Sequence, residues 1–145
     1  MARVLVPVDD EEHARRACEL AGELFPTGQL VLLHVVNPSS AGHSSETPVP
    51  SVSEDWYERR EAEAAALFDR LEDHLADRGN DGSPTVERHV TVNQPARGIV
   101  TYIEDEDIDH VVMGSHSRQG VSRLLLGSVA ETVTRRSPVP VTVVK

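Results

Sequence analysis

Cysteine and aromatic residues are scarce in this chain of 145 residues. Its one cysteine, Cys18, excludes a disulfide framework within the chain. Cys18 falls in an alanine-rich helical pattern, where a small buried thiol is expected. Aromatic residues make up 3% of the sequence and hydrophobic residues 39%. The core must therefore be built from valine, leucine, isoleucine and alanine.

Positive charge is also in short supply. The chain has 24 Asp and Glu against 14 Lys and Arg, a net charge of -10, and Lys145 is its one lysine. A chain this acidic repels nucleic-acid backbones and anionic membranes, so neither is expected as a partner. An acidic, lysine-poor surface suits a high-salt cytosol. A genomic base composition that replaces lysine by arginine would leave the same pattern.

Long hydrophobic runs and targeting segments are missing as well. No apolar run approaches the roughly 20 residues that span a bilayer, and the N-terminus has no signal-peptide pattern. We therefore expect a cytoplasmic protein in which residues 1–145 form one domain. Residues 37–52 are rich in Ser, Pro and Gly without an apolar period, which predicts a flexible loop.

Short apolar runs alternate with helical patterns along the chain. The continuous runs at 2–8, 30–36 and 111–113 indicate strands buried on both faces, as in a parallel sheet. The alternating run 86–92 and the proline-containing run 139–144 indicate strands at the sheet edges. Amphipathic helices are predicted between them. The sequence thus predicts an α/β fold, a doubly wound, Rossmann-like sheet of five parallel strands with helices on both faces.

The most informative stretch follows the fourth predicted strand. Residues 114–127 form a loop rich in glycine and serine, and Ser128 and Glu131 after it have the spacing of a capping box. Backbone N–H groups and the helix dipole at such a helix start favour phosphate. Arg118 and Arg123 would add positive charge. Because doubly wound sheets bind ligands at the carboxyl ends of their strands, this loop lies at the expected crevice.

Three other kinds of site are excluded, because this sequence has the wrong residues at the positions that each of them requires. A dinucleotide fold needs glycines in the first strand–helix turn, where residues 9–12 are all acidic. A P-loop needs a lysine before the Ser or Thr, and none lies near Gly127. A phospho-receiver domain needs an aspartate after the third strand and a lysine after the fourth or fifth. Asn93 and Ser137-Pro138 occupy those places.

The segment from Gly114 to Ser128 resembles the nucleotide loop of the universal stress protein family, usually written G-x2-G-x9-G-[ST]. Four further segments resemble the family's other fixed points: V-P-V-D at 6–9, L-L-H-V-V at 32–36, the turn at 93–95 and S-P-V-P-V at 137–141. The resemblance covers nearly the whole chain. It implies a cytoplasmic, usually homodimeric protein; many members bind ATP, and others have lost the glycines and bind none. ATP is the expected ligand here, with AMP and ADP as alternatives. The acidic residues 10–12 at the rim of the crevice favour a bound Mg²⁺ or Mn²⁺ beside the phosphates.

The resemblance also implies the residues of the nucleotide site. Pro7, Asp9 and Val35 would line the adenine and ribose pocket, with Asp9 accepting from the ribose or holding the metal ion. The loop residues implied to wrap the sugar and phosphates are Met113, Gly114, Ser115, His116, Ser117, Arg118 and Gly120. Those implied to hold the phosphate tail are Gly127, Ser128 and Val129.

Ser117 stands where the family has its second glycine. If this position needs a positive φ, serine costs on the order of 1 kcal/mol there. If its side chain points at the phosphates, the hydroxyl instead donates a hydrogen bond to them. Both interpretations remain compatible with nucleotide binding.

No catalytic constellation accompanies the loop. His116 is the one titratable group placed to act, and we expect it to pack or to contact ribose. His34 is interpreted as a satisfied core histidine, and its place near a strand end leaves a contact with a ligand open. The sequence therefore predicts an ATP-binding regulatory protein rather than an enzyme. Two alternatives stay open. One is a dimer that binds no nucleotide and acts by protein contacts, and the other is a slow metal-dependent ATP hydrolase that uses Asp9.

The last predicted strand is expected to form a homodimer. Val139, Val141 and Val143 alternate along an edge that nothing in the sequence protects, which invites pairing with a second copy. An antiparallel, isologous pairing would place Thr142 near the twofold axis. The family resemblance implies the same partner.

Overall fold

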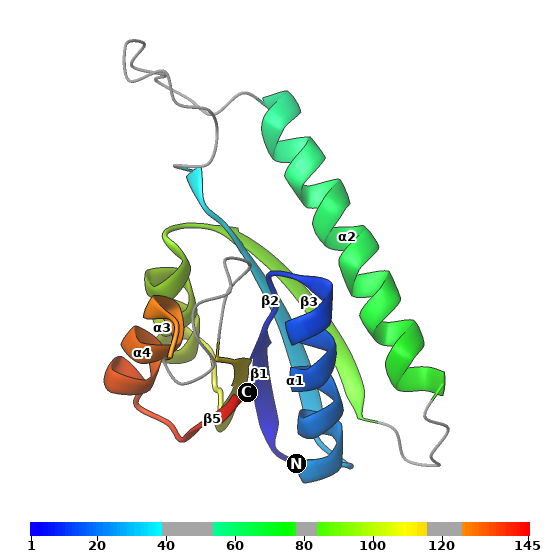
Figure 1. Ribbon diagram of the computed structural model, residues 1–145, viewed down its shortest axis with the longest axis vertical. Helices are drawn as coiled ribbons and strands as arrows, with labels where there is room; N and C mark the ends of the chain where they lie inside the picture. Colours follow the sequence, from blue (N-terminus) through cyan, green and yellow to red (C-terminus); the bar gives the residue numbers. More distant parts are fainter. Residues whose placement is uncertain (39–53, 78–83, 116–125) are drawn as a thin grey trace.

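The computed structural model describes residues 1–38, 54–77, 84–115 and 126–145. Strands and helices alternate along the chain as predicted (Figure 1). The elements are β1 (Arg3–Pro7), α1 (Glu11–Leu24), β2 (Gln29–Val36), α2 (Glu54–Asp77), β3 (Thr85–Val92), α3 (Pro95–Asp105), β4 (His110–Gly114), α4 (Ser128–Arg136) and β5 (Val141–Val144). The loop predicted to be flexible lies almost wholly outside the described residues.

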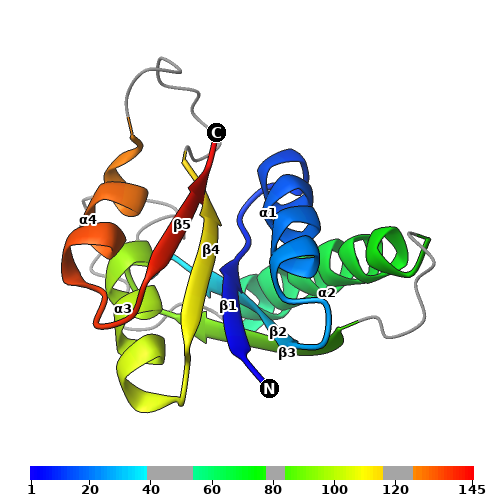
Figure 2. The ribbon, with the colours of Figure 1, turned by 90° about the horizontal axis from the view of Figure 1, so that it is seen from below.

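The five strands form one parallel sheet in the order β3-β2-β1-β4-β5. Figure 2 shows α1 and α2 on one side of this sheet and α3 and α4 on the other. The predicted doubly wound, Rossmann-like α/β fold is confirmed. β3 and β5 lie at the two edges, as their alternating and proline-containing sequences indicated.

Each face of the sheet has its own hydrophobic core, because successive strand residues point to opposite faces. In β1, Val4 and Val6 pack among the residues of α1 and α2, whereas Leu5 packs among those of α3 and α4. This two-sided burial explains the continuous apolar runs. Cys18 is fully buried in the first core, as predicted, and burial raises the pKa of its thiol to about 12.

The helix starts agree with the sequence at α1 but not at α4. Asp10 caps α1, since its Oδ1 accepts from the backbone N–H of His13 at 2.9 Å. The capping box predicted at Ser128 is wrong. Gly127 is the N-cap of α4 and Ser128 is its first residue, and none of the described side chains forms a capping hydrogen bond there. Glu131 instead pairs with Arg135 at 3.0 Å.

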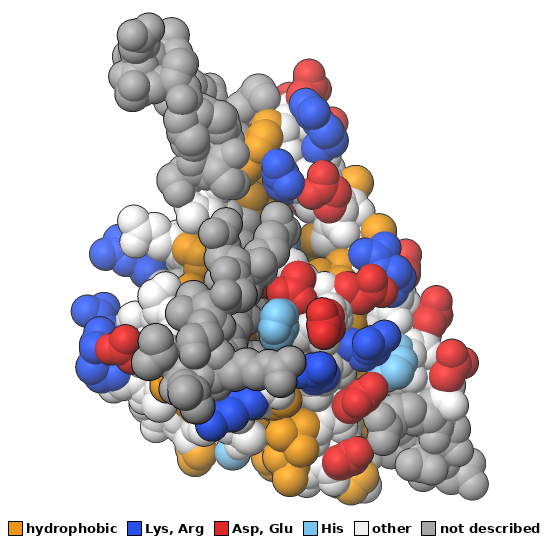
Figure 3. All heavy atoms as spheres, viewed as in Figure 1, with side chains coloured by type: hydrophobic (Ala, Val, Ile, Leu, Met, Phe, Trp, Pro, Cys, Tyr) orange, Lys and Arg blue, Asp and Glu red, His pale blue; other side chains and the backbone are white. Residues whose placement is uncertain are grey.

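Acidic side chains on the surface of α1 and α2 are interspersed with arginine (Figure 3). Nε of Arg70 in α2 lies 3.0 Å from Oε1 of Glu11 in α1. Arg88 of β3 forms ion pairs with Asp69 and Glu72 of α2. Ion pairs as exposed as these stabilise a fold only slightly. None of the helices in the described ranges is both long and apolar enough to cross a membrane.

Candidate functional site

A cavity of about 380 Å³ lies at the carboxyl ends of the strands. Its lining includes Pro7 to Asp10, at the end of β1, and Gly114 and Ser115, at the end of β4. The strand order reverses between these two strands, so the cavity occupies the crevice predicted for a doubly wound sheet. Its volume is in the range of small-molecule sites, about 300–1,000 Å³.

One wall of the cavity is apolar. It is made by residues of β2, α3 and α4: Leu33, Val35, Pro95, Ile99 and Ala130. Gly98 allows α3 to approach β2 here, since a Cβ atom at Gly98 would lie 2.8 Å from Cγ1 of Val35. A flat, weakly polar group such as a nucleobase suits this wall.

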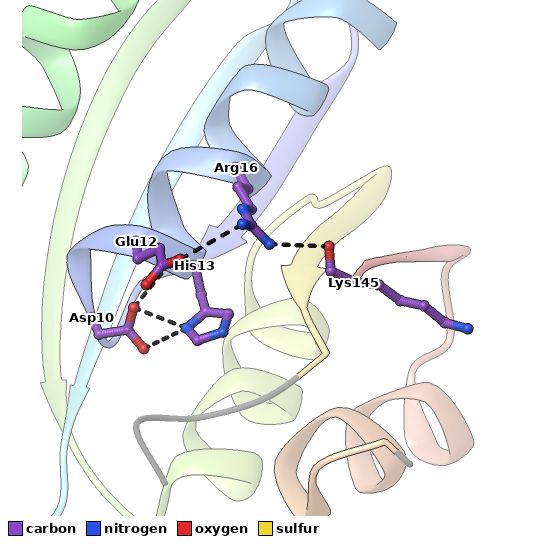
Figure 4. A network of polar contacts seen from close by, with 5 residues as sticks. All are labelled: Asp10, Glu12, His13, Arg16 and Lys145. Atoms are coloured by element: carbon purple, nitrogen blue, oxygen red, sulfur yellow. Dashed lines mark hydrogen bonds and ion pairs between the residues drawn. The ribbon is translucent and has the colours of Figure 1, made fainter. Parts of the chain in front are cut away.

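The opposite face of the sheet contributes polar residues to the cavity, beginning at the first turn of α1. Asp10 and His13 both line it, and Nδ1 of His13 lies 2.8 and 3.0 Å from the two carboxylate oxygens of Asp10 (Figure 4). An ionised carboxylate only accepts hydrogen bonds, so Nδ1 carries the proton. The imidazole is thereby held in one tautomer, with Nε2 as its second polar atom.

A second histidine lines the cavity from β2. Nδ1 of His34 lies 2.9 Å from the carbonyl oxygen of Val8, to which it must donate. When neutral, His34 therefore keeps Nε2 as a hydrogen-bond acceptor. The sequence correctly indicated that His34 is satisfied by a hydrogen bond, but its side chain is half-buried at the cavity instead of enclosed in the core.

The two ends of the glycine- and serine-rich segment are hydrogen-bonded to each other. The backbone N–H of Gly127 donates to the carbonyl of Ser115 at 2.6 Å. The N–H of Ser115 donates in turn to the carbonyl of Val144 at 2.8 Å. This brings the N-terminus of α4 to the end of β4, where Val129 and Ala130 line the cavity. The first N–H groups of a helix have no partner within the helix, so they can bind an anion here.

Most of the predicted site residues that the structure describes lie at the cavity. Those that line it are Pro7, Asp9, Val35, Gly114, Ser115, Gly127 and Val129. Met113 instead lies in the core on the α3 and α4 face, and Ser128 is exposed at the first position of α4. The other predicted residues, His116, Ser117, Arg118 and Gly120, are outside the described ranges.

His13 and Arg60 are among the cavity residues that the sequence did not place at the site. His13 has a local signal, because the spacing Asp10-x-x-His13 after a strand places both residues on one side of a helix start. Arg60 has no such signal. It belongs to α2, a helix whose many charged residues by themselves predict a solvated face. The packing of α2 brings it to the cavity.

Charge at the cavity is mixed. Asp9 and Asp10 are its acidic lining residues, and Arg60 is the only Lys or Arg among those that the structure describes. Within the described part of the chain, no three His, Cys, Asp or Glu side chains gather into a metal-binding group. Asp9 alone would leave a metal ion dependent on ligand oxygens for most of its coordination.

A doubly wound sheet with a cavity at its carboxyl edge is the architecture in which many α/β domains bind their ligands. The model of the universal stress protein family matches residues 1–145, and the chain belongs to this family. Universal stress protein MJ0577 of Methanocaldococcus jannaschii is 28% identical over 158 residues, covering 99% of this chain and 94% of that protein.

Solved structures share the fold. The structure of hypothetical protein MJ0577 has a TM-score of 0.79 at 29% identity, covering 99% of this chain and 94% of the other. A universal stress protein in complex with cAMP has a TM-score of 0.66 at 22% identity, covering 99% and 97%. The universal stress protein from Archaeoglobus fulgidus in complex with dAMP has a TM-score of 0.66 at 19% identity, covering 100% and 98%.

Proposed function

We propose that this protein is a cytoplasmic, ATP-binding regulatory protein of the universal stress type. The observation that carries the proposal is the cavity itself, which combines an apolar wall with the N-terminus of α4. Two proteins of the same fold are complexes with cAMP and dAMP, which supports an adenine nucleotide as the ligand. AMP and ADP are included in the proposal, because they share the base and the first phosphate.

The chemistry of the cavity suggests how the nucleotide lies. The base packs against Val35 and Ile99, where burial of its faces is favourable. The phosphates lie at Gly127, near the first N–H groups of α4 and its dipole. Asp9 accepts from the ribose or holds Mg²⁺ or Mn²⁺ together with phosphate oxygens. The loop residues His116, Ser117, Arg118 and Gly120 complete the sugar and phosphate contacts.

Two measurements test this proposal. Protein purified without added nucleotide is denatured, and the released small molecules are identified by mass spectrometry. Separately, thermal melts are recorded with ATP and Mg²⁺ at low and high salt, because a ligand that binds only the folded state stabilises it by about 2.7 kcal/mol at 100 times its Kd. We expect the melting temperature to rise.

No shift at millimolar ATP in either salt condition, with no copurified nucleotide, would contradict the proposal. The protein would then be the non-binding dimer of the same family.

A further inference from the structure

Arg60, in the second turn of α2, has a buried Nε with no hydrogen-bond partner among the residues that the structure describes. Its Nη1 donates to Oε2 of Glu63 at 2.9 Å, and its guanidinium carbon lies 5.7 Å from the centre of the Trp56 ring. Buried N–H groups are nearly always paired in folded proteins. Because Arg60 lines the cavity, a bound ligand can supply the partner that the described residues do not.

The strand order places Arg60 away from the phosphate end of the cavity. α2 packs against α1, β2 and β3, whereas Gly127 is bound to Ser115 at the end of β4. β1 lies between β2 and β4, and neighbouring strands are about 4.8 Å apart, so the ends of β2 and β4 are roughly 10 Å apart. A nucleotide with its phosphates at Gly127 therefore extends its base toward β2 and α2.

We propose that Arg60 is a specificity-determining residue that contacts the nucleobase, with its Nε–H donating to a ring nitrogen of a purine. The inference rests on the proposed function, since it concerns the same cavity. Glu63 and Trp56 hold the guanidinium in one orientation before the ligand arrives, which lowers the entropy lost on binding. The unsubstituted ring nitrogens of adenine, N1, N3 and N7, are acceptors around the edge of the base, which suits a donor in a cavity wall.

The test compares two neighbouring arginines of the same helix. Arg60→Met removes the guanidinium but keeps much of the aliphatic side chain, and Arg59→Met is the control because Arg59 is exposed and does not line the cavity. Calorimetric titrations are run with adenosine, AMP and ATP. We expect Arg60→Met to weaken all three by a similar factor of about ten or more. Arg59→Met should bind like the parent protein.

Arg60→Lys separates the Nε donor from the charge, because lysine keeps the charge but has a methylene group, which donates no hydrogen bond, at the place of Nε. We expect it to bind as weakly as Arg60→Met. Circular dichroism and thermal melts verify that each variant is folded.

Parent-like affinity in Arg60→Met or Arg60→Lys would overturn the inference. A loss that grows from adenosine to AMP to ATP would also overturn it, since Arg60 would then contact phosphate. If the parent protein binds none of the three ligands, the proposed function fails together with the inference. If instead the parent protein binds and the Arg60 variants bind equally well, only the inference fails.

Discussion

Among single residues, Gly127 connects the fold most directly to the proposed ligand. It precedes α4, and its N–H donates to the carbonyl of Ser115 at 2.6 Å. Its position at the end of a loop predicts a surface residue whose substitution spares the fold. The structure shows that this residue is buried, because the contact with Ser115 draws it against the end of β4.

We predict that Gly127→Val abolishes nucleotide binding, because a branched side chain would occupy space that N–H groups use to reach phosphate. Since Gly127 is buried, some loss of stability is also expected, and the melting temperature must be measured beside the affinity. The comparison variant is Ser117→Gly, which should change affinity by no more than about tenfold, or about 1.4 kcal/mol. ATP binding equal to the parent's in a folded Gly127→Val would show that the phosphate site is misassigned.

Two helical glycines offer a matched pair of substitutions. At Gly98, a Cβ atom would lie 2.8 Å from Cγ1 of Val35 and 3.2 Å from Cβ of Asn93. At Gly22, the nearest atom to a new Cβ would be Cδ2 of Leu75, at 3.8 Å. The first position is overpacked by alanine, whereas the second has room for it.

Gly98→Ala should lower the free energy of unfolding by about 1–3 kcal/mol through overpacking. Because Val35 lines the cavity, the same change should weaken nucleotide binding. Gly22→Ala should raise the free energy of unfolding by roughly 0.5–1 kcal/mol, since alanine is the better helix former. Urea unfolding curves of both variants measure the effects, and equal effects in the two would contradict the packing argument.

Among the secondary-structure elements, the pair β4 and β5 contains a half-buried contact with a titratable side chain. Nε2 of His110 lies 2.7 Å from Oγ1 of Thr142, and its ring centre is 5.1 Å from that of Phe25. Burial lowers the pKa of His110 below its ordinary value of 6.5. The folded protein therefore disfavours the charged form of this histidine.

This pKa shift predicts a loss of stability in acid. In the unfolded chain His110 takes up its proton near pH 6.5, whereas in the folded protein it does so only at lower pH. The contribution of neutral His110 to stability is therefore complete above pH 6.5. It is lost as the pH falls from there through the pKa that His110 has in the folded protein. His110→Gln should be less sensitive to pH in this window, as measured by unfolding at a series of pH values. Parallel curves for parent and variant would contradict the assignment.

For the whole molecule, the edge position of β5 bears on assembly. The carbonyl of Pro140 accepts from Val111 of β4, and that of Val144 accepts from Ser115, directly after β4. Pro140, Thr142 and Val144 therefore turn their backbone groups inward. Alternation along a strand then turns the N–H groups of Val141 and Val143 toward the open side of the sheet. These two residues are the ones available to pair with a second copy.

We predict a homodimer formed through β5 and the preceding Val139. Val141→Pro removes an outward N–H group without affecting a bond to β4, so it should give a folded monomer. Thr142→Pro is the control for damage to the sheet, because it removes an inward N–H group and should unfold the edge. Light scattering at micromolar concentration measures the mass. A monomeric parent, or a Val141→Pro variant that remains dimeric, would contradict the prediction.

Local features of the sequence were sufficient to predict the strands and helices. Burial on both faces leaves continuous apolar runs in β1, β2 and β4, and Asp10 and Pro95 are side chains that favour the first turn of a helix. These signals act between residues close in the chain, so they can be recognised without knowing the fold. The edge positions of β3 and β5 could also be predicted from the sequence. An exposed edge strand tolerates alternating polar residues, as in β3, and prolines, as beside β5.

The walls of the cavity depended on contacts between residues far apart in the chain. Arg60 comes from a helix between β2 and β3, yet lines a cavity with Gly127. The N-cap of α4 falls at Gly127 because Ser115 holds that residue, a bond across eleven intervening positions. Met113 lies in the core because strand alternation turns it toward α3 and α4. The sequence alone thus determined the elements and the edge at which a ligand would bind. Which side chains surround that ligand was decided only by tertiary packing, since packing brings distant residues together.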